Sequence, residues 1–565
     1  MSYYPIVDHR DDVLHSIALD NENDEQHTNF GTSDPTPVDR KFFKSADAVH
    51  TAISVAAGTV MTLFGYEQGV FGGIILGQDF LEYFNHPTPA MQGFVTSVYD
   101  LGCFGGALIA LGIFCVKYLN LESNTYHFLV IGEKLGRKRM LVLFTIIMGI
   151  GIMIQTASHN MNQMVWGRLI AGIGNGGNTA TAPVWHVETS HQSAKGSAVV
   201  KEMAVNVLGF VISNFVTLAF SGFMTEAQWR FPLGVQMIFV IVILVMVPLL
   251  PESPRWLLAR RRDDEALKVL NLLNDHDATE EFEQIRSSVK AEMAAQGSWA
   301  QLLKGGQPLR RVLLGMILQV AQQFSGINVL AYYLPVVLHR SVGLSELTAR
   351  VVAAGNAVSF WLTTSASIFF VDKIGRRPLL MVGAGVMTIA FLGVSIGVGT
   401  GLASPESHLA GIAAVVFIWL YFTAFSSGWI SVPWLYPAEV NSLKFRTKGA
   451  ALATAMDWLC NYVVVQTTPV GIQHLQWGLY LIYALFNLAW IPLVYYLVVE
   501  TQGRSLEETD GWFDRNPEWF VHKADHSIAR GTFSSHERVG GFQGAEDHEA
   551  MMEAFEIEDD EKLAP

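Results

Sequence analysis

The sequence predicts an all-α membrane protein in which twelve transmembrane helices form two six-helix halves, repeated in parallel orientation. Three observations predict this fold class: the composition, a series of membrane-length apolar runs, and an internal repeat. Of 565 residues, 50% are apolar and only 16% charged, and the mean hydropathy is +0.30. A soluble protein carries about 25% charged residues. The composition therefore excludes a nucleic-acid-binding protein, a soluble multidomain enzyme and a disordered chain.

The negative charge of the chain is concentrated at its two ends. Residues 1–44 carry a net charge of −5 and residues 505–565 one of −11, which leaves residues 45–504 slightly basic at +2. The first segment lacks apolar periodicity and is expected to be a disordered cytoplasmic tail. It contains no apolar stretch, so no cleavable signal peptide is expected. Residues 505–565 are expected to form an acidic cytoplasmic tail. The three cysteines, Cys103, Cys115 and Cys460, lie in apolar runs and offer no disulfide framework.

Twelve apolar runs are each close to the ~20 residues that a helix needs to cross the hydrocarbon core. They cover residues 49–76, 91–113, 140–158, 163–185, 198–221, 230–250, 311–338, 347–371, 378–401, 410–436, 448–471 and 477–499. The charged, helix-patterned segment 252–308 separates six crossings from six. We therefore predict a first half at 45–251, a cytoplasmic helical linker at 252–308 and a second half at 309–504.

The distribution of basic residues predicts the orientation. The connections after crossings two, four, six, eight and ten contain Lys134, Arg137, Lys138, Arg139, Lys195, Arg255, Arg260, Arg261, Lys373, Arg376, Arg377, Lys444, Arg446 and Lys448. On the opposite side, only Arg230, Arg340 and Arg350 break the pattern. Because cytoplasmic loops carry an excess of Lys and Arg, both termini and the linker are expected in the cytoplasm.

The two halves contain the same motifs in the same order. Glu133-Lys-Leu-Gly-Arg-Lys-Arg139 recurs as Asp372-Lys-Ile-Gly-Arg-Arg-Pro378, 239 residues later. Glu188 matches Glu439 after 251 residues, and Glu252 matches Glu500 after 248. Basic loops that serve topology alone would not explain paired carboxylates and glycines at matched offsets. The pattern indicates a parallel duplication, which is common in secondary transporters that hold substrate between the halves.

Seven motifs together resemble the sugar porter family of the major facilitator superfamily, above all its fungal members, over about residues 45–510. They are Gly65-Tyr-Glu-Gln-Gly69, Gly136-Arg-Lys-Arg139, Gly167-Arg168, Pro251-Glu-Ser-Pro-Arg255, Gln322-Gln-Phe-Ser-Gly-Ile-Asn328, Asp372-Lys-Ile-Gly-Arg-Arg377 and Glu500-Thr-Gln-Gly-Arg-Ser505. The resemblance implies the major facilitator fold and transport of a sugar or polyol by alternating access. We also expect a functional monomer, a location in the plasma membrane, and no cofactor apart from a proton as coupling ion.

Two opposite charges lie inside predicted crossings, Glu67 in the first and Arg168 in the fourth. A charged side chain in the lipid interior pairs, faces a cavity or loses its charge. One interpretation is a static ion pair that locks two helices. The other is a protonation switch, because burial and the neighbouring guanidinium shift a carboxyl pKa in opposite directions. The resemblance supports the switch, since proton-coupled sugar porters carry an acid, usually Asp, at the position of Glu67.

A neutral polyhydroxylated ligand is bound by side-chain amides, which donate and accept, and by aromatic faces. The candidates in crossings seven, eight, ten and eleven are Gln322, Gln323, Asn328, Tyr332, Asn356, Trp434, Trp458 and Asn461, with Trp429 as a weaker one. Such amides can instead bond neighbouring helices, and tryptophans can anchor helix ends at the membrane surface. The family usually has a Gln early in crossing five, where Met203 or its neighbour stands here, with Glu202 and Asn206 close by. This leaves the choice between hexose and a smaller polyol such as glycerol open.

Arginine and acid residues at the predicted cytoplasmic ends form a candidate gate. The set is Arg137, Glu188 and Glu252 in the first half and Arg376, Glu439 and Glu500 in the second. Exposed ion pairs contribute only about 0–1 kcal/mol each, so a group of them can stabilise a closed state without freezing it. The alternative is that these arginines serve topology alone.

Gly172-Ile-Gly-Asn-Gly-Gly177 matches the dinucleotide fingerprint GxGxxG but lies in an apolar helix with no strand before it. We expect its glycines to allow close helix packing, and no nucleotide to bind.

Residues 112–129 interrupt the family pattern between crossing two and the first basic motif. Their 18 residues correspond to 54 nucleotides, an intron-like length. Gly112 can hold a GT donor, the Leu129/Val130 junction an AG acceptor, and Ser123-Asn124 a CTAAC branch sequence. The segment is therefore either an in-frame intron that was wrongly translated, so that Leu111 would join Val130, or a genuine insertion. Sequencing the transcript distinguishes the two.

The sequence as a whole predicts a proton-coupled importer of a sugar or polyol. A facilitative carrier remains an alternative, as does a non-transporting nutrient sensor, although the tail at 505–565 is modest for a sensor. No Ser/His/Asp, metal-ligand or phosphate-loop pattern indicates an enzyme. Neither a nucleic acid nor a metal is expected as a partner.

Overall fold

The computed structural model describes residues 45–110, 135–190, 195–274, 277–295, 297–403, 408–504, 506–516 and 518–521. Within these ranges the regular secondary structure is helical. Residues 1–44, 111–134 and 522–565 lie outside the described part. The expectations for the N-terminal tail, for the insertion 112–129 and for most of the acidic tail therefore stay predictions.

The first half contains six long helices. They are α2 (Ala46–Ile75), α4 (Pro89–Ala110), α6 (Arg137–Thr156), α7 (Met161–Glu188), α8 (Lys195–Phe220) and α9 (Ala227–Met246), with the short α3 (Gln78–Tyr83) after α2. A 3₁₀ turn, Val247–Leu249, extends α9. Each helix corresponds to one of the first six predicted crossings.

The second half repeats this count, but two of its crossings are broken. Its elements are α14 (Gln307–Gln323), α15 (Ile327–Ala331), α16 (Leu334–Arg340), α17 (Glu346–Ser367), α18 (Val371–Ile374), α19 (Arg376–Ala403), α20 (His408–Ala424), a π-helical turn (Phe425–Trp429), α21 (Val432–Val440), α22 (Arg446–His474) and α23 (Trp477–Leu497). Crossing seven breaks between α14 and α15 at Gly326, whose φ of 92° lies in the left-handed region. Crossing ten breaks at the π-helical turn. Such interruptions within a membrane are tolerated where the backbone is buried in protein or lines a cavity.

Nine of the described helical segments are long and apolar enough to cross a membrane by length and composition. The other three predicted crossings correspond to α7, α17 and α22, whose interiors are rich in Gly, Ala, Asn and Thr. These three helices are less apolar because they supply polar side chains to the protein interior. The twelve-helix fold in two halves is thus confirmed.

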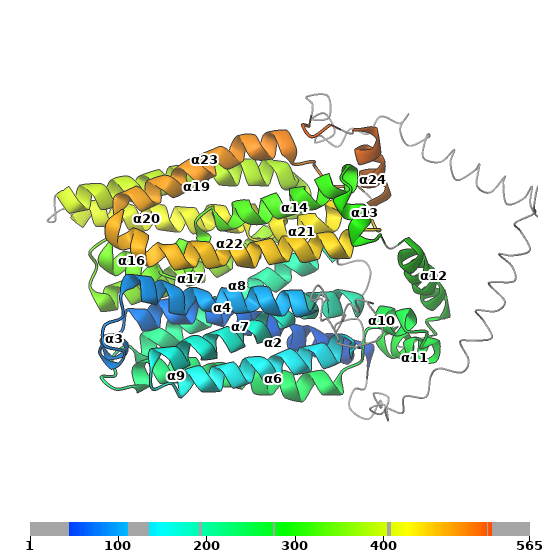
Figure 1. Ribbon diagram of the computed structural model, residues 1–565, viewed down its shortest axis with the longest axis horizontal. Helices are drawn as coiled ribbons and strands as arrows, with labels where there is room; N and C mark the ends of the chain where they lie inside the picture. The colour runs from blue at the N-terminus through cyan, green and yellow to red at the C-terminus, as the bar shows by residue number, and fades with distance from the viewer. Residues whose placement is uncertain are drawn as a thin grey trace, which may run out of the picture. The chain divides into compact units, whose positions relative to one another are not determined.

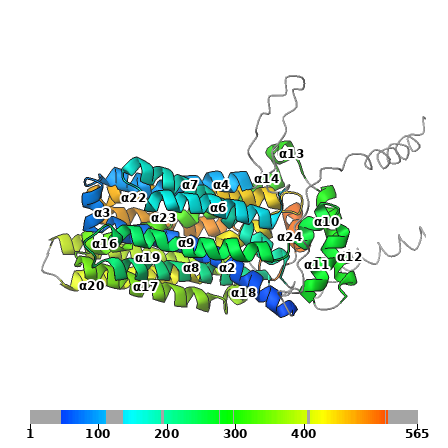
Figure 2. The ribbon, with the colours of Figure 1, turned by 90° about the horizontal axis from the view of Figure 1, so that it is seen from below.

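The two halves pack along two helix pairs, α4 against α22 and α8 against α17. Figures 1 and 2 show the long helices running side by side, with α3 near one end. At the other end lie α10 (Pro254–Ala259), α11 (Asp263–Asn274), α12 (Thr279–Ala295), α13 (Trp299–Leu303) and α24 (Leu506–Arg515). We refer to this second end as the linker end.

Large apolar side chains face outward on the peripheral helices. On α9, Ile238 and Ile241 are exposed, as are Ile389 and Ile396 on α19. A monomeric soluble protein rarely exposes apolar patches of this extent, whereas lipid is a favourable environment for them. The outer surface of the bundle therefore fits a bilayer.

The glycines of the GxGxxG match bring α7 close to two neighbours. A Cβ atom at Gly172 would lie 2.1 Å from the Tyr99 carbonyl oxygen on α4, and one at Gly174 would lie 2.4 Å from the Met148 nitrogen on α6. On α4, a Cβ atom at Gly106 would lie 2.0 Å from the Ile173 carbonyl oxygen of α7. The expectation that these glycines allow close helix packing is confirmed.

Gly106 and its neighbour Gly105 provide a matched test of this packing. Gly106→Ala is expected to destabilise the fold by about 1–3 kcal/mol, because the added methyl forces α4 away from α7. Gly105→Ala meets nothing within 4 Å and is expected to be neutral or to stabilise the helix slightly. Thermal unfolding of both variants in the same detergent measures the difference. Equal melting temperatures would show that α4 and α7 do not depend on this contact.

Candidate functional site

The Glu67–Arg168 pair lies fully buried between α2 and α7. Arg168 Nη1 is 3.4 Å from Glu67 Oε2, and both side chains have no solvent exposure. Gln155 on α6 donates from Nε2 to Glu67 Oε1 over 3.2 Å. The pair is longer than the roughly 2.7–2.9 Å of a tight charge-assisted hydrogen bond. The carboxylate is therefore shared between a guanidinium and a neutral amide rather than clamped by a bidentate fork.

Three further groups hold Arg168 in place. Its Nη2 donates to the Thr96 carbonyl oxygen of α4 over 3.1 Å. Its Cζ lies 4.1 Å from the centroid of the Phe71 ring and 5.1 Å from that of Tyr99. Aromatic faces attract a guanidinium, particularly where water is excluded. Arg168 thus has contacts with α4, through Thr96 and Tyr99, that do not depend on Glu67.

Four of the predicted substrate-binding residues meet in one hydrogen-bond network. Asn328 donates from Nδ2 to Gln323 Oε1 over 2.6 Å and to Asn461 Oδ1 over 2.8 Å. Asn461 in turn donates to Asp100 Oδ1 over 3.2 Å, and the Tyr332 hydroxyl donates to the same oxygen over 3.1 Å. The network joins the broken crossing seven to α22 and, through Asp100, to α4 of the first half.

The opposite end of this network is a second carboxylate. Gln323 donates from Nε2 to Asp457 Oδ1 over 2.6 Å. Asp457 and Asp100 are both buried. The donors of Gln323 and Asn461 therefore point toward the two acids, while their carbonyl oxygens converge on the Asn328 amide. The acids at the ends fix the direction of the whole chain of amides.

The remaining candidates form no hydrogen bond to this network among the described residues. Gln322 donates to the backbone carbonyl of Trp429 over 2.6 Å and so ties α14 to the π-helical turn, while Trp429 donates to the Leu380 carbonyl over 2.9 Å. Trp458 packs edge-on against Phe64 of the first half, with ring centroids 5.5 Å apart.

Two of these candidates have little polar contact. Asn356 is buried on α17, and neither of its amide atoms has a hydrogen-bond partner among the described residues. Trp434 is partly buried on α21 and makes no hydrogen bond with the described network.

The residues near the missing amide of crossing five make other contacts. Met203 is buried, and Asn206 donates to the Met61 carbonyl oxygen of α2 over 3.3 Å. Glu202 Oε1 lies 2.8 Å from His186 Nδ1. The amide that the family resemblance leads us to expect in crossing five is thus not replaced by either neighbour within the described network.

Sequence reasoning missed Asp100, Asp457 and Gln155. The two acids lie in the predicted crossings two and eleven, and an ionisable residue within a span is a functional candidate by default. That signal was available for both acids. Gln155 had no such signal, because a lone Gln near a helix end gives no indication of the partner it reaches.

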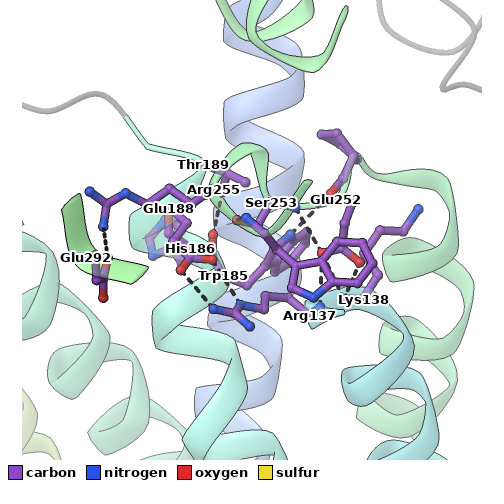
Figure 3. Close-up of polar contacts among 12 residues, drawn as sticks. Arg137, Lys138, Trp185, His186, Glu188, Thr189, Glu252, Ser253, Arg255 and Glu292 are labelled. Atoms are coloured by element: carbon purple, nitrogen blue, oxygen red, sulfur yellow. Dashed lines mark hydrogen bonds and ion pairs between the residues drawn. The ribbon is translucent and has the colours of Figure 1, made fainter. Parts of the chain in front are cut away.

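At the linker end, the first gate set forms as a group (Figure 3). Arg137 binds Glu188 through both Nε and Nη2, each over 3.1 Å. Glu252 accepts three hydrogen bonds from backbone nitrogens. Its Oε1 accepts from Arg137 over 3.1 Å and from Ser253 over 2.9 Å, and its Oε2 accepts from Lys138 over 3.2 Å. Glu252 thus caps the N-terminus of α6, where backbone N–H groups favour an anion. Burial raises the pKa of the Glu252 carboxyl. The hydrogen bonds from the backbone and the charges of Lys138 and Arg137 act in the opposite direction and lower it.

The second gate set repeats this arrangement at the start of α19. Arg376 Nη2 lies 3.0 Å from Glu439 Oε1. Glu500 accepts from the backbone nitrogens of Arg376 over 2.9 Å and of Arg377 over 3.0 Å. Each carboxylate packs against a glycine of positive φ, Gly136 at 85° and Gly375 at 97°. Each ion pair joins two helices of the same half. The first set therefore stabilises the first half, and the second set stabilises the second half.

The family model described as "Sugar (and other) transporter" matches residues 125–513. The MFS-type transporter oryC of Aspergillus oryzae is 41% identical over 85% of this chain and 88% of that protein. The sugar transporter STL1 of Saccharomyces cerevisiae is 33% identical over 81% of this chain and 80% of its own. A partially occluded, inward open structure of the xylose transporter XylE from E. coli superposes with a TM-score of 0.65 at 24% identity, over 81% of this chain and 99% of that one.

Glu500 tests the helix-capping role in the second half. Glu500→Ala leaves buried backbone N–H groups at the start of α19 without an acceptor, so the variant is expected to lose about 1–3 kcal/mol of stability. Glu500→Gln keeps one accepting oxygen and is expected to lose less. Thermal unfolding of both variants in lipid nanodiscs measures the order. If Ala and Gln were equally stable, the carboxylate would not act as a cap.

Proposed function

This chain belongs to the family of sugar (and other) transporters, and from that premise we propose that it imports a sugar or polyol by alternating access, in symport with a proton carried by Glu67. As a member of this family it is a multi-pass integral membrane protein, and it is a transporter rather than an enzyme. The observation that carries the coupling proposal is the buried, loosely held Glu67 carboxylate between Arg168 and Gln155.

The coupling follows from the energy of a buried charge. A proton on Glu67 removes one charge from the lipid interior and releases Arg168 from its partner. When the halves rock, the hydration of Glu67 and its distance to Arg168 change together, and the affinity for the proton changes with them. The carboxylate can therefore load on one side of the membrane and unload on the other.

The available energy is sufficient for accumulation. A proton that enters down ~100 mV releases about 2.3 kcal/mol, and a difference of two pH units adds roughly 2.7 kcal/mol. At ~1.4 kcal/mol per decade, this supports accumulation on the order of a thousandfold.

The substrate site of the proposal is the amide network with its aromatic neighbours. Gln323, Asn328 and Asn461 offer donors and acceptors that match hydroxyl groups, and Trp458 offers an apolar face. The printed name of STL1, a sugar transporter, supports a sugar as one candidate. The amide missing at Met203 leaves a smaller polyol as another.

Alternating access supplies the transport step. We propose that the linker end faces the cytoplasm, because the basic connections gather there, and that both termini lie on that side of the plasma membrane. Ion pairs such as Arg137–Glu188 and Arg376–Glu439 would hold each half rigid while the halves rock. The proposed carrier works as a monomer and needs no cofactor apart from the coupling proton.

A facilitative carrier is the second candidate. This alternative is favoured if the Glu67–Arg168 ion pair is a static lock between α2 and α7. The full burial of both side chains is an argument for such a lock. A sensor without transport is the weaker alternative, because a sensor has no need of a buried group that couples a proton to transport.

Glu67→Gln separates coupled from uncoupled transport. The variant cannot gain or lose a proton, so uphill uptake is expected to fall to equilibration while exchange of substrate across the membrane persists. The experiment measures uptake and counterflow of labelled glycerol, xylose and glucose in a yeast strain that lacks sugar carriers, at two external pH values. A variant that still concentrates any of the three would overturn the coupling. A wild type that equilibrates each solute without pH dependence would favour the facilitative carrier.

Gln323→Ala tests the substrate network. Loss of one hydrogen-bonding amide is expected to raise the KM of the transported solute about tenfold, or about 1.4 kcal/mol. Gln322→Ala is the matched control, because it removes an amide of equal size that binds the Trp429 backbone. It is expected to lower the melting temperature more than it changes KM. An unchanged KM in Gln323→Ala would place the binding site elsewhere.

A further inference from the structure

Asp100 connects the two halves of the protein near the middle of α4. It lies on α4 of the first half, and its Oδ1 accepts from Tyr332 over 3.1 Å and from Asn461 over 3.2 Å, both in the second half. Its other oxygen, Oδ2, is buried and has no hydrogen-bond partner among the described residues. One oxygen of this carboxylate thus accepts hydrogen bonds from the amide network and Tyr332, and the other oxygen can accept from a further donor.

The available oxygen lies near a guanidinium with a free donor. Arg168 donates to the Thr96 carbonyl, one helical turn before Asp100 on α4 and so roughly 6 Å away along the axis. Its Nε, like Asp100 Oδ2, is buried and has no partner among the described residues. Arg168 is therefore in contact with Glu67 on α2 and, through the Thr96 carbonyl, with the helix that carries Asp100.

The charge balance of this region favours an Arg168 that is shared between the acids. Among the described residues, the buried charged side chains of α2, α4, α7 and α22 are three carboxyl groups and one guanidinium: Glu67, Asp100, Asp457 and Arg168. With every group ionised, the net charge would be −2 in a lipid interior that strongly disfavours unpaired charge. The titratable groups that act on Asp100 are Arg168, Glu67, Asp457, Tyr332, Tyr333 and Cys103. Arg168 is the cation among them.

We propose that Asp100 is a second partner of Arg168: when Glu67 takes up a proton, the guanidinium moves its ion pair from Glu67 to Asp100. The step forms and breaks no covalent bond apart from the proton transfer. One proton passes from water to the Glu67 carboxylate, Arg168 stays protonated, and the net charge of Glu67, Arg168 and Asp100 changes from −1 to 0. The inference rests on the proposed proton coupling through Glu67.

This exchange connects the proton to the substrate. Hydrogen bonds to an unpaired charge are the strong ones. When Arg168 forms an ion pair with Asp100, the hydrogen bonds from Tyr332 and Asn461 to this carboxylate therefore become weaker. Tyr332 and Asn461 are then freer to bind substrate hydroxyls. Asp100 thus acts as a positioning residue, since it reaches the proton site through Arg168 and the substrate site through Asn461.

Infrared difference spectroscopy of the full chain in lipid nanodiscs tests this exchange without any substrate. The protonated-carboxyl band that disappears in Glu67→Gln reports the Glu67 proton during a pH titration. In Asp100→Asn, Arg168 has no second acid partner, so protonated Glu67 loses its stabilisation. The proton affinity of Glu67 is expected to fall about tenfold, which moves the midpoint about one pH unit toward acid.

Two matched variants separate this role from a purely structural one. Asp100→Glu keeps the carboxylate and is expected to restore the wild-type midpoint. Tyr332→Phe removes a hydrogen bond to the same oxygen but leaves the charge, so it is expected to lower stability without moving the midpoint. Should Asp100→Asn not fold, Asp100→Ser is expected to give the same shift.

The outcomes distinguish this inference from the proposed function. A wild type with no band that depends on Glu67 overturns the proton-coupling proposal and this inference with it. A titrating wild type whose midpoint is unchanged in Asp100→Asn overturns the role of Asp100 alone. Equal shifts in Asp100→Asn and Tyr332→Phe also overturn it, because the hydrogen bond rather than the charge would then set the proton affinity.

Discussion

The energy of charge in a lipid interior is the constraint on which this structure depends. Glu67 and Arg168 are both without solvent exposure, and neither can be hydrated as long as the bundle stays closed around them. The protein meets this constraint with a neutral amide from Gln155, a backbone carbonyl at Thr96 and the Phe71 ring. Each of these partners comes from a different part of the first half, so the helices must pack closely before the charges can be held.

Close packing in turn depends on residues with no side chain. α7 approaches α4 and α6 through glycines whose added Cβ atoms would collide with backbone atoms, as at Gly172 and Gly174. These contacts place Arg168 beside α4 and within reach of α2. Small residues let helices approach in a membrane because association there relies on van der Waals packing rather than on the hydrophobic effect. The glycines of Gly172–Gly177, which match a nucleotide-binding motif, therefore help to position the buried guanidinium of Arg168.

The fold was predictable from sequence to a greater extent than the site. Apolar runs of membrane length and the duplicated motifs were sufficient for twelve helices in two halves, because both signals depend on local composition. The site depends on partners far apart in the chain. Asn328 meets Asn461 across 133 positions, and Asp100 meets Asn461 across 361. Composition indicates that an acid such as Asp100 is unusual in a crossing, but only the packing of α4 against α22 shows which amide it binds.

The orientation of the amides explains why the acids at the ends of the network matter for recognition. Asp457 and Asp100 accept from Gln323 and Asn461, which turns both carbonyl oxygens toward the single amide of Asn328. An ionised carboxylate accepts only, so neither end of the network can reverse while its acid is charged. A hydroxyl group can donate or accept and can therefore enter such a fixed arrangement at any point. A ligand that could only donate or only accept would satisfy only part of the network, which disfavours it against a polyhydroxylated solute.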